Sequence, residues 1–395
     1  MGGFFITKAP LVALLATMLL ISRGSSAEPN PVPRLLPPAE AIYPIHPHEL
    51  WPAERRASKL TERGRNVRGI YVPYTRLRSW TPRRLESWIR QIGADAVILD
   101  IKDDRGRITF RRDHPLATGS PHGEVRHMRE ILAALQKHEI YVIGRLVCFK
   151  DNNFVRVRPA EAMRERGTGA IWRDRGGVAW IDPHSTVAHE YIASVARAAE
   201  DIGFDEIQLD YVRFPVEPGA NRAVFPRREG TPDRHEAIAA LLARVDRAID
   251  IPLSIDVFGL TAYNPGDADG LGQSLEHLAP HVDVISPMVY LANWPARYWE
   301  NPTPAGTHSL ISGAVRAIRR RLGDDVAVRP LLQAFAWRAK NFGTPFIHNQ
   351  IDAAVGGGSS GYLFWNQSGN YQRVQTAFSQ LDRREVSSIP VISRR

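Results

Sequence analysis

The segment Glu206–Pro215, with the sequence EIQLDYVRFP, has the composition of a buried β-strand, yet it carries Gln208, Asp210 and Arg213. An ionised carboxylate inside a packed strand is costly unless it is paired, hydrogen-bonded or used in function. The kind of sheet that holds this strand therefore decides where Asp210 points and what it does.

Seven further segments share this β-branched or aromatic character, at 67–74, 95–103, 140–149, 252–259, 282–290, 326–335 and 361–366. Helical segments with apolar residues at three- and four-residue spacing lie between them, and several end in glycine. Eight strands that alternate with eight helices predict an α/β fold, a (β/α)8 TIM barrel formed as a single domain. A doubly wound open sheet is the rival fold, but the glycine-rich turn that it requires after an early strand is absent.

The barrel is predicted to occupy residues 66–384 of the 395-residue chain. Residues 28–65 form an extension that is rich in proline and then in arginine, which is typical of a linker or a wrapping arm. Residues 385–395 form a basic C-terminal tail.

Residues 1–27 have the pattern of a secretory signal peptide, in which Lys8 precedes an apolar run and Ser25-x-Ala27 has the form of a cleavage site. The apolar run is short for a membrane span, so no span is expected after cleavage; an uncleaved N-terminal anchor is the alternative. We therefore expect an exported protein that is periplasmic or extracellular.

The formal net charge is +9, and removal of the signal with Lys8 and Arg23 leaves 9 − 2 = +7. A basic exported protein favours anionic polymers or envelope surfaces. The basic residues are dispersed and form no stripe interleaved with aromatic residues, which argues against a nucleic-acid partner. Cys148 is the one cysteine, so the barrel holds together without an intramolecular disulfide.

Side-chain alternation predicts which strand residues face the barrel axis. In the strand at 95–103, Val97, Leu99 and Ile101 form an apolar face toward the helices, and the alternate residues point inward. Applied to the other strands, the same rule turns a set of polar side chains toward the axis, near the strand ends: Asp100, Lys102, Arg145, Gln208, Asp210, Asp256 and Gln333.

Active sites of these barrels lie at the C-terminal ends of the strands, where this set would converge. Two carboxylates that face one cleft suit the cleavage of a glycosidic bond, because one protonates the leaving oxygen while the other attacks the sugar or activates water. The alternative is a polar plug, in which the carboxylates pair with Lys102 and Arg145 only to satisfy one another.

Sugar substrates also need aromatic platforms and hydrogen-bonding groups, and the predicted rim supplies both. The predicted substrate-binding residues are Tyr71, Lys102, Arg145, Gln208, Arg213, Gln273, Tyr290, Trp294, Gln333 and Trp365. For any single aromatic residue, simple loop packing is the alternative. The loop at 264–273 lacks the spaced ligands and closing glutamate of a calcium loop, and the histidines show no metal-ligand spacing, so neither a metal nor a cofactor is expected.

Four segments, AVILDIKDDRGRI (96–108), GFDEIQLDYVRFP (203–215), SIDVFG (254–259) and DGLGQSLEHLAPHVDVISPMVYLANW (269–294), resemble a bacterial family of proposed TIM-barrel glycoside hydrolases. The resemblance covers roughly residues 66 to 380 and implies a hydrolase-like barrel in the cell envelope. It implies that Asp100, Asp210 and Asp256 are the acidic strand-end positions. By similarity to other sugar-cleaving barrels, Asp210 is the expected nucleophile or base, with Asp256 as the leading general acid and Asp100 as the reserve candidate.

The sequence therefore predicts an exported glycoside hydrolase that acts on an envelope or extracellular polysaccharide or oligosaccharide, and the basic charge favours an anionic one. A non-catalytic carbohydrate-binding barrel is a second hypothesis. An envelope protein that acts through structure or partner binding is a third, for which the proline-rich arm and the basic tail would matter most.

Overall fold

The computed structural model describes residues 57–110, 125, 127–228, 233–264, 270–300 and 302–387. The predicted signal peptide and most of the predicted arm, up to residue 56, lie outside the described residues. So does the end of the predicted basic tail, from residue 388.

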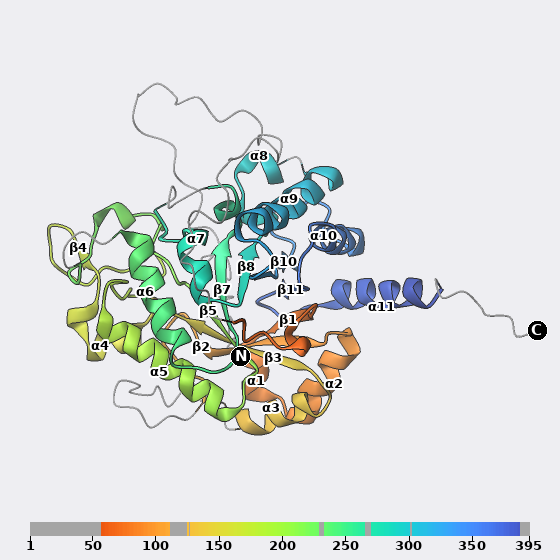
Figure 1. Ribbon diagram of the computed structural model, residues 1–395, viewed down its shortest axis with the longest axis horizontal. Coiled ribbons are helices and arrows are strands. Elements are labelled where there is room, and N and C mark those ends of the chain that lie inside the picture. Colours follow the sequence, from red (N-terminus) through yellow and green to blue (C-terminus); the bar gives the residue numbers. More distant parts are fainter. Residues whose placement is uncertain are drawn as a thin grey trace, which may run out of the picture.

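The described strands close into the predicted (β/α)8 barrel (Figure 1). In chain order, the parallel strands of the barrel wall are β1 (Arg68–Val72), β2 (Ala96–Lys102), β3 (Tyr141–Val147), β5 (Glu206–Asp210), β7 (Leu253–Phe258), β8 (Val284–Met288), β9 (Ala327–Val328), β10 (Leu331–Gln333) and β11 (Tyr362–Trp365). Strands β9 and β10 share the seventh position, and β10 pairs with both β8 and β11, which in turn pairs with β1 and closes the ring. Each of the eight predicted strands is present.

Helices surround this barrel, with bounds α1 (Tyr74–Ser79), α2 (Pro82–Ile92), α3 (Met128–Gln136), α4 (Asn152–Val157), α5 (Thr186–Ile202), α6 (Arg234–Asp246), α7 (Leu275–Leu278), α8 (Ala296–Trp299), α9 (Pro304–Leu322), α10 (Thr344–Gly356) and α11 (Gln372–Ser387). Local sequence sets their ends: Ser185 caps the first turn of α5, and Gly203 ends that helix at a φ of 110°. The short strands β4 (Arg164–Glu165) and β6 (Ala223–Val224) pair in the loops above the barrel, which the sequence did not predict. Among the described residues, no helix is both long and apolar enough to cross a membrane.

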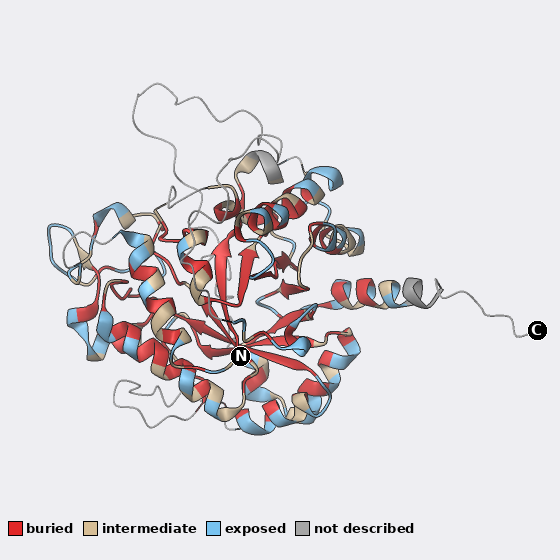
Figure 2. Cartoon of the chain, in the orientation of Figure 1, coloured by how far each residue is buried: buried red, intermediate tan, exposed pale blue. Residues whose placement is uncertain are grey.

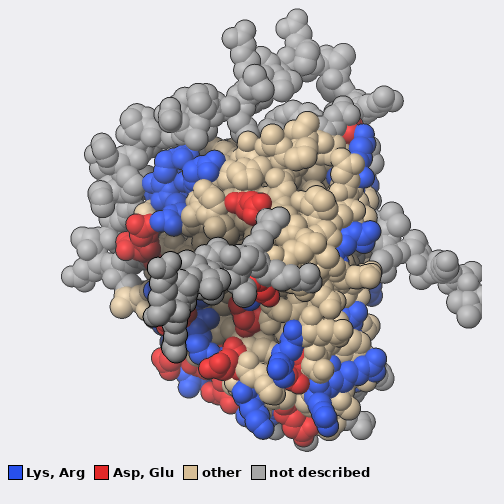
Figure 3. All heavy atoms as spheres, turned by 90° about the vertical axis from the view of Figure 1, so that its right-hand side faces the viewer, with Lys and Arg blue, Asp and Glu red and all other residues tan. Residues whose placement is uncertain are grey.

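The core has two parts, as side-chain alternation requires. Val97, Leu99 and Ile101 lie in the large cluster between strands and helices, whereas Ile98 lies in a smaller cluster inside the barrel. Figure 2 shows the strands of the barrel wall almost entirely buried and the helices buried on the side that faces them. On the face shown in Figure 3, the basic side chains form separate groups, and acidic side chains lie beside several of them.

A buried ion pair occupies the N-terminal end of the barrel interior. Arg329 donates from Nη1 to Glu206 Oε1 at 2.8 Å, and both side chains are fully buried. Ser254 Oγ and Tyr141 OH also donate to the Glu206 carboxylate, at 2.6 and 3.1 Å. The second Arg329 nitrogen, Nη2, donates to the carbonyl of Gly64 at 2.6 Å, so this end of the barrel is closed by the chain that precedes β1.

The described end of the predicted arm is therefore part of the barrel. Ser58 Oγ and the Lys59 amide both donate to Asp283, at 3.0 and 2.7 Å, just before β8 begins. Lys59 Nζ reaches Asp246 at 2.8 Å at the end of α6. These contacts fix residues 58–66 against the N-terminal ends of the strands.

Removing one member of the buried pair should destabilise the barrel strongly. We expect Arg329→Leu to lower the free energy of unfolding by about 3–5 kcal/mol, because Glu206 would stay buried without its cation. The double variant Glu206→Gln, Arg329→Leu should recover much of that loss, since no uncompensated charge remains. Urea denaturation at neutral pH measures both, and equal losses in the single and double variants would contradict the expectation.

Candidate active site

The centre of the candidate site is Arg145 on β3, whose guanidinium joins two aspartates from the neighbouring strands. Nη1 donates to Asp100 Oδ1 on β2 at 2.8 Å, while Nε and Nη2 donate to Asp210 Oδ2 on β5 at 2.8 and 2.5 Å. Burial alone would lower the pKa of Arg145, but Asp210 and Asp100 raise it well above its ordinary value, so the guanidinium stays charged. The predicted inward direction of these three side chains is thus realised.

Asp256 on β7 has a different environment. Leu209 pairs with Ile255, so Asp210 and Asp256 follow at the same level on adjacent strands. Burial, and then the negative charge of Asp210, raise the pKa of Asp256 well above its ordinary value, and Arg145 offsets this only in part. Asp256 Oδ1 is buried and has no hydrogen-bond partner in the described part of the chain. Both facts favour the protonated carboxylic acid at Asp256.

The three aspartates differ in exposure and in hydrogen bonding. Asp210 is 8% exposed, whereas Asp100 and Asp256 are each 3% exposed. Asp100 also accepts a hydrogen bond from Tyr71 OH at 2.7 Å, so each of its oxygens has a donor. Burial raises the pKa of Asp100, while Arg145 and Tyr71 oppose the shift. Asp100 is therefore placed to hold Arg145, and Asp210 is the aspartate that solvent reaches best.

Aromatic side chains at the strand ends line the same site. Tyr71 on β1 stacks on Trp365 on β11, with 3.9 Å between ring centroids, and Arg145 lies 5.0 Å from the Trp365 ring. Trp365 remains partly exposed, so it can offer a platform at the mouth. Burial, and then the negative charges of Asp256 and Asp210, raise the pKa of Tyr290 well above its ordinary value.

Lys102 does not join the aspartates, contrary to the sequence prediction. A β-bulge between Asp100 and Lys102 adds one residue to β2, so Lys102 aligns with Leu146 on the helix-facing side. Its ammonium is fully buried and pairs with Asp151 at 2.8 Å. Strict alternation fails here because the bulge reverses the direction of the side chain.

Three more residues predicted to bind substrate are buried, and two of them brace the loops. The Gln273 side chain accepts from the Phe258 amide at 3.0 Å and donates to the Asp256 carbonyl at 3.1 Å. Gln333 accepts from the amide of Ala292 at 3.2 Å and donates to two carbonyls in the following loop. Trp294 is 1% exposed and packs in the core, so it cannot present a face to a sugar.

The remaining predicted residues are Gln208 and Arg213. Gln208 lies deeper in the barrel than the aspartates, and Arg213 lies beside them. Gln208 is fully buried and donates to Ser286 Oγ at 3.3 Å. Arg213 pairs with Glu217 at 2.7 Å, and its guanidinium lies about equally close to the rings of Trp180 and Tyr211, at 5.1 and 5.2 Å.

Sequence reasoning missed Tyr211 and Lys150 as parts of the site. Side-chain alternation would turn Tyr211 toward the helices, opposite to Asp210, but β5 ends at Asp210, and Tyr211 adopts a φ of +50°. Its amide donates to Asp210 Oδ1 at 2.6 Å, and Lys150 Nζ lies 4.7 Å from the centre of its ring. The one signal in the sequence was that Tyr211 directly follows Asp210, whose side chain points inward. No group of three or more residues able to hold a metal occurs among the described side chains.

A closed (β/α)8 barrel with several carboxylates at its strand ends is an arrangement in which glycoside cleavage can take place. The chain belongs to the family described as "Putative glycosyl hydrolase domain", which matches residues 69–371. As a member of that family, it is a glycosidase. No curated protein matches the sequence.

Solved structures of glycoside hydrolases share the fold. The PgaB (BpsB) glycoside hydrolase domain from Bordetella bronchiseptica aligns with 80% of this chain and 98% of its own, at 13% identity and a TM-score of 0.58. Alpha-L-fucosidase isoenzyme 2 from Paenibacillus thiaminolyticus aligns with 82% of this chain and 50% of its own, at 11% identity and a TM-score of 0.55. The α-galactosidase from Thermus thermophilus in complex with stachyose aligns with 84% and 67%, at 16% identity and a TM-score of 0.51. At these identities the likeness concerns the fold.

The raised pKa of Asp256 makes stability depend on pH in a definite direction. Between about pH 3.9, the ordinary aspartate pKa, and the higher pKa in the folded state, the folded chain holds a proton that the unfolded chain has released. The stabilisation is complete below that range and is lost as pH rises through the folded pKa. Asp256→Asn keeps a neutral side chain, so it should gain stability over wild type at pH 8 and gain little at pH 4.

Thermal denaturation of both proteins across this pH range measures the effect, and each unit of pKa shift corresponds to about 1.4 kcal/mol. Asp210→Asn is the matched comparison and should lower stability at pH 8, because it takes a charged partner from the buried Arg145. A gain for Asp256→Asn that is the same at pH 4 and pH 8 would show that Asp256 is ionised in the folded protein.

Proposed function

We propose that the protein hydrolyses glycosidic bonds through Asp210 and Asp256 at the C-terminal mouth of the barrel. The observation that carries this proposal is the unequal distribution of positive charge between them. Arg145 makes two hydrogen bonds to Asp210 and one to Asp100, and none of them reaches Asp256. Two carboxylates with opposite protonation states are what acid-assisted glycoside cleavage requires.

In this proposal Asp256 is the general acid. Its carboxyl proton passes to the glycosidic oxygen as the bond from that oxygen to the anomeric carbon breaks. The proton then stays on the departing alcohol, and the Asp256 carboxylate regains a proton in the following step. Burial beside Asp210 supports this role, because it keeps Asp256 protonated where an ordinary aspartate would be ionised.

Asp210 is the second carboxylate of the proposed pair, and it acts as nucleophile or base. It either attacks the anomeric carbon or takes a proton from the attacking water. Arg145 and the Tyr211 amide each donate to one of its two oxygens, which fixes the carboxylate in a single orientation. Asp100 serves as a positioning residue, because it holds the opposite edge of the Arg145 guanidinium.

The substrate is proposed to be an envelope or extracellular polysaccharide or oligosaccharide. The partly exposed Trp365, stacked on Tyr71, supports carbohydrate binding because an aromatic face packs well against the C–H groups of a sugar ring. Export is supported by the signal-like residues 1–27, and the net positive charge favours an anionic polymer.

The roles of the two aspartates can be separated by the leaving group. Asp210→Asn should lower turnover by about 10³-fold or more on every substrate, because the nucleophile or base is lost. Asp256→Asn should lose as much on alkyl glycosides but far less on dinitrophenyl glycosides, whose leaving group needs no proton. A panel of such glycosides with different sugars, assayed with the wild type and both variants, measures this pattern.

Asp246→Asn is the matched control, because this carboxylate pairs with Lys59 at the opposite end of the barrel and should not affect turnover. Circular dichroism verifies folding in each case. Full activity of Asp210→Asn would overturn the assignment. Specific oligosaccharide binding without hydrolysis by the wild type would instead favour the carbohydrate-binding barrel.

Export predicts a defined N-terminus. If residues 1–27 are removed as a signal peptide, the mature protein begins at Glu28. Fractionation of expressing cells, followed by the intact mass of the protein, measures this directly. A cytoplasmic chain that retains Met1 would contradict the proposed export, and an exported chain that keeps its apolar N-terminus would support the anchor instead.

A further inference from the structure

A cavity of about 470 Å³ lies beside the candidate active site, between the loops that follow β3, β5 and β7. Its lining residues are His184, Phe214, Phe225, Arg228, Asp233, Arg234, His235 and Gly270. None of the three aspartates lines it, so it is separate from the proposed catalytic centre. Phe214 lies four residues beyond Asp210, which places the cavity on the same C-terminal face of the barrel.

Three rings form one wall of this cavity. His184, Phe214 and Phe225 pack edge to face in every pairing, with centroid distances of 5.2, 5.8 and 5.1 Å. Arg234 lies over both phenyl rings, 5.1 Å from Phe214 and 5.8 Å from Phe225, and also donates to the Gly270 carbonyl. The wall is therefore apolar and fixed in place.

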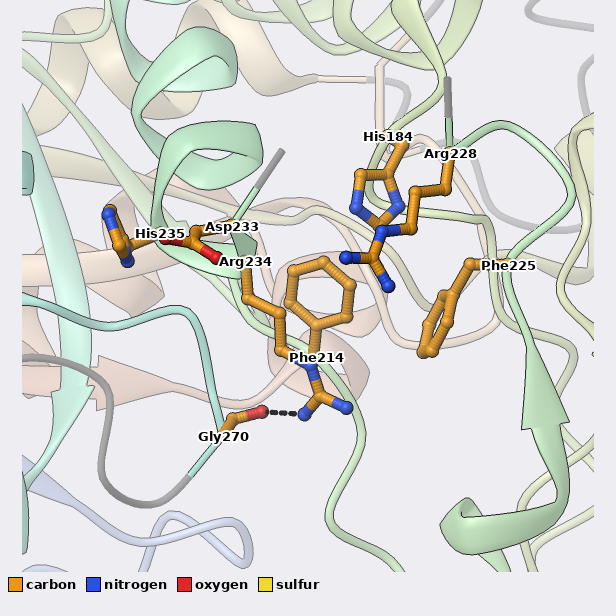
Figure 4. A pocket seen from close by; sticks show the side chains of 8 residues that line it. All are labelled: His184, Phe214, Phe225, Arg228, Asp233, Arg234, His235 and Gly270. Atoms are coloured by element: carbon orange, nitrogen blue, oxygen red, sulfur yellow. Dashed lines mark hydrogen bonds between the residues drawn. The ribbon is translucent and has the colours of Figure 1, made fainter. Parts of the chain in front are cut away.

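Arg228 and Arg234 bring two positive charges to the cavity, and Figure 4 shows them extending from opposite sides of the Phe214 ring. Arg228 is exposed, and its guanidinium makes no hydrogen bond or ion pair within the described part of the chain. Asp233 contributes one negative charge, at the start of α6. With neutral histidines the lining carries a net charge of +1, so an anionic group can enter without opposing a negative surface.

His184 provides the second, independent observation. Its side chain is only 5% exposed, and Nδ1 lies 2.8 Å from Oδ1 of Asp182, which is fully buried. The backbone amides of His184 and Arg227 also donate to Asp182, at 3.0 and 2.7 Å, so the carboxylate is fixed. The other ring nitrogen, Nε2, is buried without a hydrogen-bond partner in the described residues. A buried polar atom held in place yet left unpaired is typical of a site that a ligand completes.

We propose that this cavity is a second carbohydrate subsite that binds an anionic sugar unit, one that carries a carboxylate or a phosphate ester. The guanidinium groups of Arg228 and Arg234 hold the anionic group, because planar forks of N–H donors match such oxygens. The partly exposed Phe225, which packs on the buried Phe214, contacts the apolar side of the sugar ring, and His184 Nε2 pairs with a polar group of the ligand. The choice of a sugar rests on the proposed function, whereas the anion preference follows from the cavity itself.

The experiment uses the full chain with ¹³C-labelled histidine, and the His184 ring signal is identified by its absence in His184→Gln. Glucuronate, glucose 6-phosphate and glucose are titrated separately, since they share a sugar ring and differ in the anionic group. We expect a saturable shift of the His184 signal with at least one anionic sugar and none with glucose at the same concentration. Preference for glucuronate identifies a carboxylate ligand, and preference for glucose 6-phosphate identifies a phosphate ester.

Arg228→Gln and Arg234→Gln should each weaken the binding of the anionic sugar by about tenfold or more, because each removes a charge-assisted hydrogen bond. Arg222→Gln is the matched control: Arg222 is an exposed arginine that pairs with Glu165 outside the cavity, and its variant should bind like wild type. No shift with either anion, an equal shift with glucose, or unchanged affinity in both cavity variants would overturn the proposal.

The same titration on Asp210→Asn separates this proposal from the proposed function. Under both proposals this variant loses turnover but keeps its affinity for the anionic sugar. If the wild type binds the anion at His184 yet hydrolyses no glycoside, the second site stands and the catalytic proposal falls. If hydrolysis occurs and no anion binds at His184, the catalytic proposal stands and the second site falls.

Discussion

The candidate site depends on one guanidinium shared between two strands. Arg145 lies on β3, between β2 and β5, so its fork reaches Asp100 on one side and Asp210 on the other. Asp256 lies on β7, one strand further round the barrel, and receives no hydrogen bond from Arg145. The order of the strands therefore sets which carboxylate is neutralised by a cation and which is left to bind a proton.

A second polar layer lies at the N-terminal end of the barrel interior, and its buried carboxylate is completely hydrogen-bonded. The contrast with Asp256 bears on function. At the N-terminal end, Glu206 has a full set of donors from Arg329, Ser254 and Tyr141. Both oxygens of this carboxylate have donors, which shows how this chain neutralises a carboxylate when only structure is at stake. The upper layer leaves Asp256 with a buried, unpaired oxygen. A buried carboxylate with an unpaired oxygen at the strand ends is an argument for catalysis over simple packing.

Much of this arrangement could be predicted from the sequence, because alternation along a strand is a local rule. It gave the eight strands and the inward direction of Asp100, Arg145, Asp210 and Asp256. The rule failed for Lys102, since the bulge in β2 depends on how β2 pairs with β3 and not on the residues of β2 alone. The bracing role of Gln273 could not be predicted from the sequence either, because its partners lie at the ends of distant strands. The pKa shift of Asp256 follows from burial and neighbours that only the closed barrel brings together.

Tyr211 links the two sites through the backbone. A left-handed conformation costs a bulky residue about 1–2 kcal/mol, so its φ of +50° must be held by its surroundings. The turn directs the Tyr211 amide at Asp210 Oδ1, while Lys150 and Arg213 lie near its ring. It also ends β5 and sends the chain to Phe214, in the wall of the neighbouring cavity. One strained residue thus orients the proposed catalytic carboxylate and sets the start of the loop that shapes the second site, so the two sites have a common origin in the end of a single strand.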